Sequence, residues 1–322
     1  LAGDERAGPL WLVLPQLKRL RKLSRKLAAS YGLVPLRLTL HVGEDFHHLA
    51  SGLRAVHEPF AWQLIERGDR LGHALALGID PEKWCGENPT VCMSRWERML
   101  DLAWMIAALT NRLLGIKITE DTHSLVLMRM STELARHLAE TGLKPATNDA
   151  FIKLFTDVLA SPRSLPRLID QHEHPVADNL MHPLYLRLRG LANTQAKLDD
   201  VVTIQTESEK PLLVALNTEL AKLIGAWQIT IEANPSSNLL IGGLDSPVEQ
   251  PLFRLHPLDA DGKALPITLN ADDPLSFATS LADEYAYTWA ALTLAGGVPP
   301  GYARQWLDET ARASWRSRFT EP

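Results

Sequence analysis

Residues 36–45 read LRLTLHVGED, a pattern that predicts a strand delivering polar side chains at its C-terminal end. Apolar and polar residues alternate before His41, Gly43 and Glu44 arrive together. A neutral imidazole suits a divalent metal, and a nearby carboxylate can move protons on water held there. Gly43 allows the strand to turn and lets a ligand approach the backbone closely. The stretch by itself is equally compatible with a plain strand end that has no function.

The composition is that of a soluble globular protein with one large or two ordinary domains. Of the 322 residues, 46% are hydrophobic and 22% charged, and the net charge of −5 gives no general electrostatic reason to bind nucleic acid. Cys85 and Cys92 form no CxxC pair, which argues against a disulfide scaffold and favours a cytoplasmic location. No apolar run could span a membrane. The chain starts at Leu1 with no signal peptide, so we expect further residues upstream.

Helical patterns flank this first strand. Leucines at helical spacing among basic residues predict a helix over residues 16–31 that ends at Gly32, with a solvated basic face around an apolar stripe. Two short helical stripes follow in residues 45–67, together with three histidines that we interpret as surface residues without function: His47, His48 and His57. The next apolar segment, residues 69–77, carries His73 beside a glycine. A lone histidine on such a segment is more often structural than catalytic.

The middle of the chain, residues 81–225, is expected to form a helical block of domain size without strands. Its expected helices run from a capping box of Ser94 and Glu97 to Gly115, over about 122–140, from Thr147 or Asn148 onward, and over about 211–224. His172 and His174 form an HxH pair with polar neighbours, which we interpret as a loop and not as a metal site.

Strand character returns in the last part of the chain. Residues 227–233 alternate polar and apolar side chains and lead into the loop 234–238, NPSSN. Residues 265–269 form a further strand, and Asp272 and Asp273 follow it directly. Adjacent carboxylates repel each other unless a cation or hydrogen-bond donors are present. The alternative is an N-cap aspartate beside a first-turn aspartate, which is a common pattern.

Polar residues thus follow four successive strands, as the active site of a (β/α)8 barrel requires. They are His41 with Glu44, His73, Ser237 with Asn238, and Asp272 with Asp273. The pieces LTLHVGE, RLGHA, NPSSN, TLNADDP and LADEY occur in this order. On these pieces the chain resembles the adenosine deaminase family of metal-dependent hydrolases, over roughly residues 15–80 and 226–320.

The resemblance implies one Zn²⁺ ion per site and hydrolytic deamination of adenine to hypoxanthine in adenosine, an adenine nucleotide or RNA. His41 and Asp272 would be zinc ligands, and Asp272 would also help to deprotonate the attacking water. Glu44 would protonate N1 of the purine ring, and His73 would orient the hydroxide that attacks C6. The residues implied to bind substrate are Gly43, Glu44 and Asp273, the last through N7 of the base.

The fold implied is a TIM-type (β/α)8 barrel of which the last four strands are visible. Strands 5 and 6 would lie in residues 1–80, and strands 7 and 8 in residues 226–322. The family takes further zinc ligands from an HxH motif on its first strand, which would have to lie upstream of this chain. RLGHA also replaces the usual RIGHG. Residues 81–225 would be a large all-helical insertion.

Large insertions of this kind are seen in the deaminase subunit of the RADAR phage-defence system, which assembles into shells. The resemblance therefore implies a homo-oligomer formed through the insertion, a defence-system partner and no membrane. The insertion could instead be a lid over a large substrate. Two other functions stay open: a different metal-dependent amidohydrolase, against which Asp273 argues, and a non-catalytic assembly protein, against which Glu44 and Asp272 argue.

Overall fold

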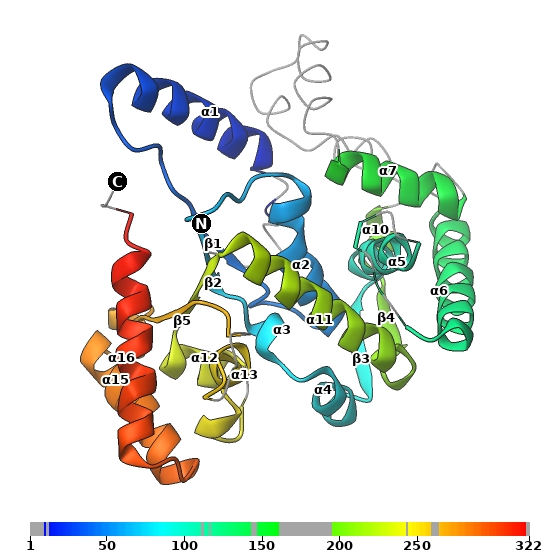
Figure 1. The fold of residues 1–322 in the computed structure, drawn as a ribbon. Coiled ribbons are helices and arrows are strands. Elements are labelled where there is room, and N and C mark those ends of the chain that lie inside the picture. Colours follow the sequence, from blue (N-terminus) through cyan, green and yellow to red (C-terminus); the bar gives the residue numbers. More distant parts are fainter. Residues whose placement is uncertain are drawn as a thin grey trace.

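The computed structural model describes residues 13–110, 118–142, 147–160, 195–242, 244–258 and 264–319, with residues 10, 113, 114 and 116 (Figure 1). A parallel sheet of four strands lies at its centre, in the order β1-β2-β5-β6. The bounds are β1 Thr39–Val42, β2 Arg70–His73, β5 Thr230–Ala233 and β6 Ile267–Leu269. Neighbours in the sheet succeed one another along the chain with helices between them. The prediction of four parallel strands is confirmed, and their arrangement is consistent with part of a barrel.

The two faces of this sheet differ in polarity. In β1 the buried Leu40 belongs to the apolar core, whereas Thr39 and His41 point to the opposite face because successive side chains of a strand alternate. On that polar face Glu232 of β5 accepts hydrogen bonds from Thr39 Oγ1 at 2.6 Å and from Arg70 Nη1 at 2.9 Å. These contacts join three strands beneath the strand ends, where the predicted site residues stand.

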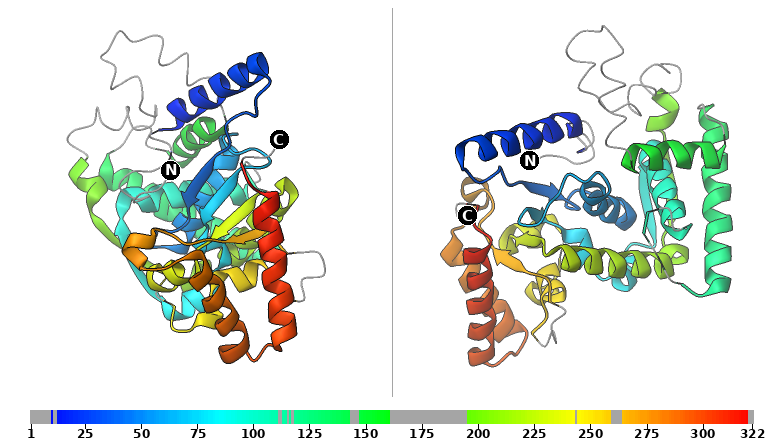
Figure 2. Two further views of the ribbon diagram at one scale, coloured as in Figure 1. Left: turned by 90° about the vertical axis from the view of Figure 1, so that its left-hand side faces the viewer. Right: turned by 45° about the horizontal axis from the view of Figure 1, so that its top comes forward.

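Helices connect the strands and pack around the sheet (Figure 2). Those near the sheet are α1 Leu14–Tyr31, α2 Leu49–Ala61, α3 Leu75–Gly78, α4 Pro81–Glu87, α11 Lys210–Trp227, α12 Pro235–Ile241, α13 Pro251–Leu255, α14 Pro274–Phe277, α15 Leu281–Ala290 and α16 Pro300–Arg316. Helix α11 packs against α2 and leads into β5, and α16 packs against β6. Within the described residues no helix has the length and apolar character needed to cross a membrane.

Helix α1 ends at Gly32 in the left-handed conformation, as predicted, but its buried side differs from the expectation. Of the four leucines in the predicted stripe, Leu17 packs on the core, whereas three are exposed to solvent: Leu20, Leu23 and Leu27. Leu14 of this helix is buried in the core, and a buried ion pair also attaches the helix, because Arg21 donates to Asp69 Oδ1 at 3.2 Å and to Oδ2 at 2.8 Å. Asp69 also accepts a hydrogen bond from the backbone N–H of Leu38 at 2.9 Å. One buried carboxylate therefore fixes α1 to the starts of β1 and β2.

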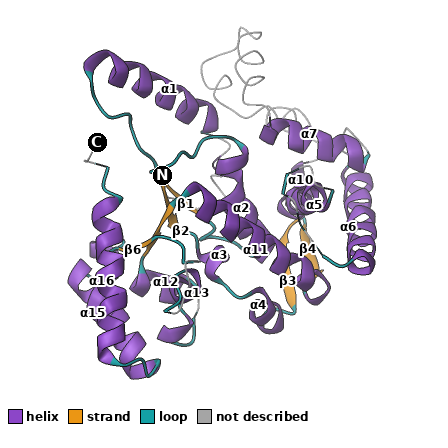
Figure 3. Cartoon of the chain, viewed as in Figure 1, coloured by secondary structure: helices purple, strands orange, loops and turns teal. Residues whose placement is uncertain are grey.

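The segment between β2 and β5 is not all-helical, contrary to the prediction (Figure 3). Beyond α4 it contains α5 Arg95–Leu109, α6 Glu120–Thr141, α7 Asn148–Ala160, α10 Gln195–Asp199 and the strands β3 Thr90–Ser94 and β4 Val201–Gln205. The two strands pair antiparallel. Each strand has five residues, and its partner lies more than about 100 residues away along the chain. The two strands are therefore not joined by a short turn, and the sequence shows no hairpin pattern that would reveal them. The domain boundaries at 81 and 225 stay predictions.

Details of the helices in this segment also correct the sequence interpretation. Ser94 caps α5 by accepting a hydrogen bond from the N–H of Glu97, as expected, but α5 ends at Leu109 and not at Gly115. Helix α6 ends at Gly142 in the left-handed conformation, as predicted. The HxH pair at 172 and 174 lies outside the described residues.

Two of the histidines interpreted as surface residues are buried: His48 and His57. His57 lies on α2 and accepts a hydrogen bond on Nδ1 from the indole N–H of Trp104 at 3.1 Å. Trp104 comes from α5, so a polar contact joins these two helices inside the core. Periodicity could not show this, because the partner of His57 belongs to a distant helix.

The buried His57 predicts a loss of stability in acid. Burial lowers the pKa of His57 to about 4, from an ordinary value near 6.5. Between these values the unfolded chain binds more protons, so the free energy of unfolding falls as the pH falls, by up to about 3 kcal/mol in total. Urea denaturation of the wild type and of His57→Gln at pH 7 and pH 4.5 measures this. Equal pH dependence in both proteins would contradict the assignment.

Candidate active site

The predicted site residues meet where β1, β2 and β6 end. Strand β1 stops at Val42, and Gly43 takes a positive φ of 68°, so the chain turns there. The turn brings Glu44 back to the side of His41, and Glu44 Oε2 lies 3.5 Å from His41 Nδ1. A side chain added at Gly43 would meet Val56 at 2.7 Å. Gly43 thus satisfies both a conformational and a packing requirement.

His73, at the end of β2, completes a compact cluster with these two residues. Its Nδ1 lies 3.4 Å from Glu44 Oε1, and its ring lies edge-on to that of His41 with 4.6 Å between centroids. One ligand atom from each of His41, Glu44 and His73 can be chosen so that all three lie within 4.8 Å of one another. Asp272 joins from the segment after β6, with Oδ2 at 3.5 Å from His73 Nε2.

A glycine makes room for the His41 imidazole. Gly72 stands opposite His41 in the β1–β2 pairing, and a Cβ at Gly72 would lie 2.5 Å from His41 Cδ2. Real Cβ atoms do not approach other atoms so closely, so a side chain there would force the imidazole away. The glycine of RLGHA therefore sets the position of the histidine on the neighbouring strand.

His73 is buried and held in an unusual backbone conformation. It has a φ of 58°, and Ala74 after it has a φ of 46°, values that cost of order 1–3 kcal/mol for residues with side chains. The amide nitrogen of Asn234 lies 3.0 Å from Nε2, and Asn238 Oδ1 lies 2.9 Å from Nδ1. With the amide donating, Nε2 accepts and Nδ1 carries the proton. Residues 234–238 are not the predicted loop but the N-cap and start of helix α12, and their two asparagines set the tautomer of His73.

The paired aspartates have separate surroundings. Asp272 accepts hydrogen bonds from Ser237 Oγ at 2.6 Å and from the backbone N–H of Asp273 at 2.9 Å. Asp273 is the N-cap of α14, accepting from the N–H of Leu275 at 3.0 Å and from Ser276 Oγ at 2.6 Å. The hydrogen bond from Ser276 lowers the pKa of Asp273. The capping role considered as an alternative is thus present, and binding of Asp273 to purine N7 stays a prediction.

Two site residues were not recognised from the sequence: Asn234 and Glu284. Glu284 is buried on α15 and accepts hydrogen bonds from Ser236 N–H at 2.9 Å, from Ser236 Oγ and from Thr279 Oγ1 at 2.6 Å. Glu284 therefore holds Ser236 at the start of α12. The next two residues of that helix, Ser237 and Asn238, contact Asp272 and His73, respectively. The LADEY piece was a signal for Glu284, although its partners could not be read from it.

Replacing Glu284 by glutamine is expected to destabilise the protein by about 1–3 kcal/mol, because a neutral amide with one acceptor oxygen replaces a carboxylate that accepts three charge-assisted hydrogen bonds. Urea denaturation followed by circular dichroism measures the free energy of unfolding. Glu87→Gln on α4, whose side chain is 55% exposed, is the matched control and should unfold like the wild type. Equal stability of both variants would contradict this role of Glu284.

The donor set suits a transition metal such as zinc, because it offers imidazole nitrogen and carboxylate oxygen at one edge of the sheet. Without a metal, the hydrogen bond with Glu44 raises the pKa of His41 against the opposing effect of burial, and the charges of Glu44 and Asp272 act in the same direction. The same carboxylates that favour an imidazolium cation would favour a bound metal cation. The residues therefore fit a metal.

Comparison with known proteins points to one family. The family model described as adenosine deaminase matches residues 200–319, the part of the chain that contains β5, β6 and Asp272. A curated protein of Streptomyces coelicolor named "Putative adenosine/adenine deaminase" is 33% identical over 101 residues. That match covers 30% of this chain, which spans about a quarter (26%) of the relative's length. The comparisons confirm the resemblance to the adenosine deaminase family that the motifs indicated.

Proposed function

We propose, starting from the match of residues 200–319 to the adenosine deaminase family, that this chain takes part in the hydrolytic deamination of adenine to hypoxanthine. The observation that supports this most strongly is the meeting of His41, Glu44, His73 and Asp272 at the ends of three parallel strands. A carboxylate, two imidazoles and a second carboxylate are the groups needed to bind a metal and to move protons. Adenosine, an adenine nucleotide and RNA are the candidate substrates.

We further propose that the metal is zinc, held by His41 and Asp272, with the remaining ligands supplied by an HxH motif that is not in this chain. A bound zinc ion would supply hydroxide at neutral pH, because zinc lowers the pKa of water to about 7. The support from this chain is the pair of N and O donors at one edge of the sheet, with His73 between Glu44 and Asp272.

In the proposed reaction this chain's residues hold and move protons. Glu44 would give a proton to N1 of the ring as water adds to C6 and loses one proton to Asp272. The proton of the new hydroxyl group would pass to the exocyclic nitrogen, and the bond from C6 to that nitrogen would break to release ammonia and leave a carbonyl at C6. His73, whose tautomer is set by Asn234 and Asn238, orients the attacking oxygen. Asp273 is exposed at the start of α14 and would hydrogen-bond N7 of the purine; because N7 is an acceptor, the carboxyl group would donate this hydrogen bond.

The test is a direct assay of the complete, zinc-loaded protein with adenosine, AMP and an adenine-containing RNA. Release of ammonia together with formation of the hypoxanthine product would support the proposal, and the most rapidly converted substrate identifies the substrate class. Absence of ammonia from all three would overturn it. Conversion of a non-purine amide, with adenine untouched, would instead support a different amidohydrolase.

We also propose that the segment between β2 and β5 forms a subunit interface. Helix α6 exposes Leu125 and Met128, which are 62% and 63% accessible and lie one turn apart. Leu125→Lys with Met128→Lys is expected to yield a smaller assembly in multi-angle light scattering, because the charges oppose burial of this face. An unchanged mass would exclude α6 from the interface. A defence-system partner and a cytoplasmic location stay predictions.

A further inference from the structure

We propose that His48 is a positioning residue for the Glu44 loop, residues 43–48, and that Glu209 and Arg98 hold His48 in place. This inference rests on the proposed function, in which Glu44 transfers protons. It assigns a role to the segment between β2 and β5, because Arg98 belongs to α5 and Glu209 to the 3₁₀ helix η3 Glu207–Glu209 that precedes α11.

The Glu44 loop is fixed at both ends. At its start the carbonyl of Gly43 accepts a hydrogen bond from the N–H of Ala76 at 2.9 Å, and Val56 leaves no space for a side chain at Gly43. At its end stands His48, the N-cap of α2 and fully buried. Glu44 lies between these two points, so the place of its carboxylate depends on both.

His48 uses both edges of its imidazole ring. Nδ1 accepts a hydrogen bond from the N–H of Ala50 at 3.1 Å and so caps α2. Nε2 therefore carries the proton in the neutral ring, and it lies 3.5 Å from Glu209 Oε2, close to the carboxylate although the geometry is not that of a hydrogen bond. The ring also packs edge-on against Trp84, with 5.2 Å between centroids. The first contact stabilises the helix, and the second connects the loop to the neighbouring segment.

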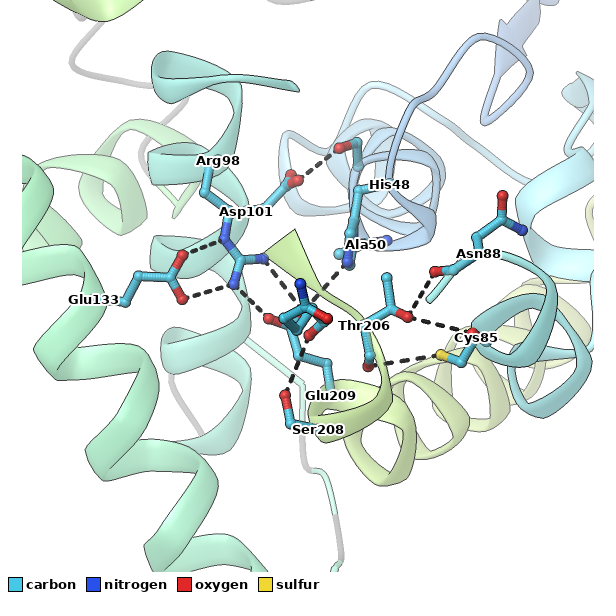
Figure 4. A network of polar contacts seen from close by, with 12 residues as sticks. His48, Ala50, Cys85, Asn88, Arg98, Asp101, Glu133, Thr206, Ser208 and Glu209 are labelled. Carbon is cyan, nitrogen blue, oxygen red and sulfur yellow. Dashed lines mark hydrogen bonds and ion pairs between the residues drawn. The ribbon is translucent and has the colours of Figure 1, made fainter. Parts of the chain in front are cut away.

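Glu209 is held in turn by a buried arginine (Figure 4). Arg98, which has no exposed surface, donates to both carboxylate oxygens of Glu209, with 3.2 Å from Nη1 to Oε2. The same guanidinium donates to Glu133 of α6 through Nε at 2.9 Å and Nη2 at 2.8 Å. A planar guanidinium bound by two carboxylates has little freedom to move.

The ion pairs thus join α6, α5 and η3, and the contact of Glu209 with the neutral His48 ring extends them to the end of the Glu44 loop. Removing one partner of a buried ion pair leaves an uncompensated charge, so these ion pairs resist disruption. A displacement of about 1 Å at a proton-transfer group can cost about a hundredfold in rate. Loss of the contact between His48 and Glu209 should therefore lower the turnover number strongly and the free energy of unfolding only slightly.

Two substitutions at His48 separate its capping of α2 from its contact with Glu209. In His48→Asn the side-chain oxygen takes the place of Nδ1 and still caps α2, but nothing reaches Glu209. In His48→Gln the amide N–H2 stands near the place of Nε2 and can donate to Glu209. We expect His48→Asn to lower kcat by roughly tenfold to a hundredfold at unchanged zinc content. Hydrogen exchange at residues 43–48 should also accelerate by roughly tenfold, and His48→Gln should restore both.

The matched control is Arg54→Gln, which breaks another buried ion pair between α2 and α5 without touching the loop. Arg54 Nε donates to Asp101 at 2.8 Å. This variant should lose thermal stability but keep the wild-type kcat and loop exchange. Unchanged kcat and loop exchange in His48→Asn would overturn the inference, as would equal changes in both variants.

A second variant tests the contact between His48 and Glu209 by a change at Glu209. Glu209→Ala removes the side chain that faces His48 Nε2, so it should reproduce the effect of His48→Asn on loop exchange. It replaces His48→Asn if that variant does not fold. An inactive wild type would overturn the proposed function alone, because hydrogen exchange would still show whether His48 holds the loop.

Discussion

Glu44→Gln is expected to lower the rate of adenine deamination by about 10²- to 10⁴-fold while the zinc content stays at the wild-type level. Glutamine keeps the size of the side chain but cannot release or take up a proton. Glu44 faces His41 at 3.5 Å and His73 at 3.4 Å, so both histidines keep a polar neighbour in the variant. Product formation by liquid chromatography and zinc by plasma mass spectrometry provide the two measurements.

The companion variant is Glu44→Asp, which keeps the carboxylate and shortens its reach by one methylene group. Its activity should lie between that of the wild type and that of Glu44→Gln. Near-normal turnover in Glu44→Gln would remove Glu44 from the mechanism. Loss of zinc in the same variant would instead identify Glu44 as a ligand, a role that the cluster with His41 and His73 also permits.

The second large effect is expected from Gly72→Ala. Its new Cβ would stand 2.5 Å from His41 Cδ2, and the β1–β2 pairing keeps the two backbones from moving apart. The imidazole must rotate away, so zinc affinity should fall by about 10- to 100-fold, as for other residues that orient a ligand. Isothermal titration of the metal-free protein with zinc measures the affinity, and deamination should fall with it.

Gly86→Ala on α4 is the matched control for this substitution. A Cβ at Gly86 meets nothing within 4 Å, and alanine lowers the entropy of the unfolded chain. The control should bind zinc like the wild type and gain about 0.4–1 kcal/mol of stability. Wild-type zinc affinity in Gly72→Ala would show that His41 is not a ligand.

The candidate site could be predicted because its residues follow a local rule. His41 lies near the C-terminal end of β1, Glu44 and Asp272 follow β1 and β6 within three residues, and the C-terminal ends of parallel strands lie at one edge of a sheet. The place of these site residues in the fold could therefore be predicted from the sequence alone. His73 followed the same rule, and its left-handed backbone was hidden because only the fold enforces such a conformation on a residue with a side chain.

The remaining features depend on contacts between distant parts of the chain. The pairing of β3 with β4, the burial of His48 and His57, and the contacts of Glu284 each involve a partner on another element. Neither hydrophobic periodicity nor capping patterns carry information about such partners. The same reason explains why the sequence did not show that three leucines of α1 are exposed: what covers a helix face is a property of its neighbours.

The position of β2 in the sheet has a consequence for synthesis on the ribosome. Strand β2 is an inner strand, and its partner β5 follows about 160 residues later, as the pairing of Arg70 with Thr230 shows. Ribosomes add about 5–20 residues per second, so one edge of β2 stays without its partner strand for roughly ten to thirty seconds. Helices α5 and α6 make contacts close along the chain and can form in that interval. We therefore expect the nascent chain to expose an unpaired apolar strand edge, and chaperone binding or aggregation to compete during that time.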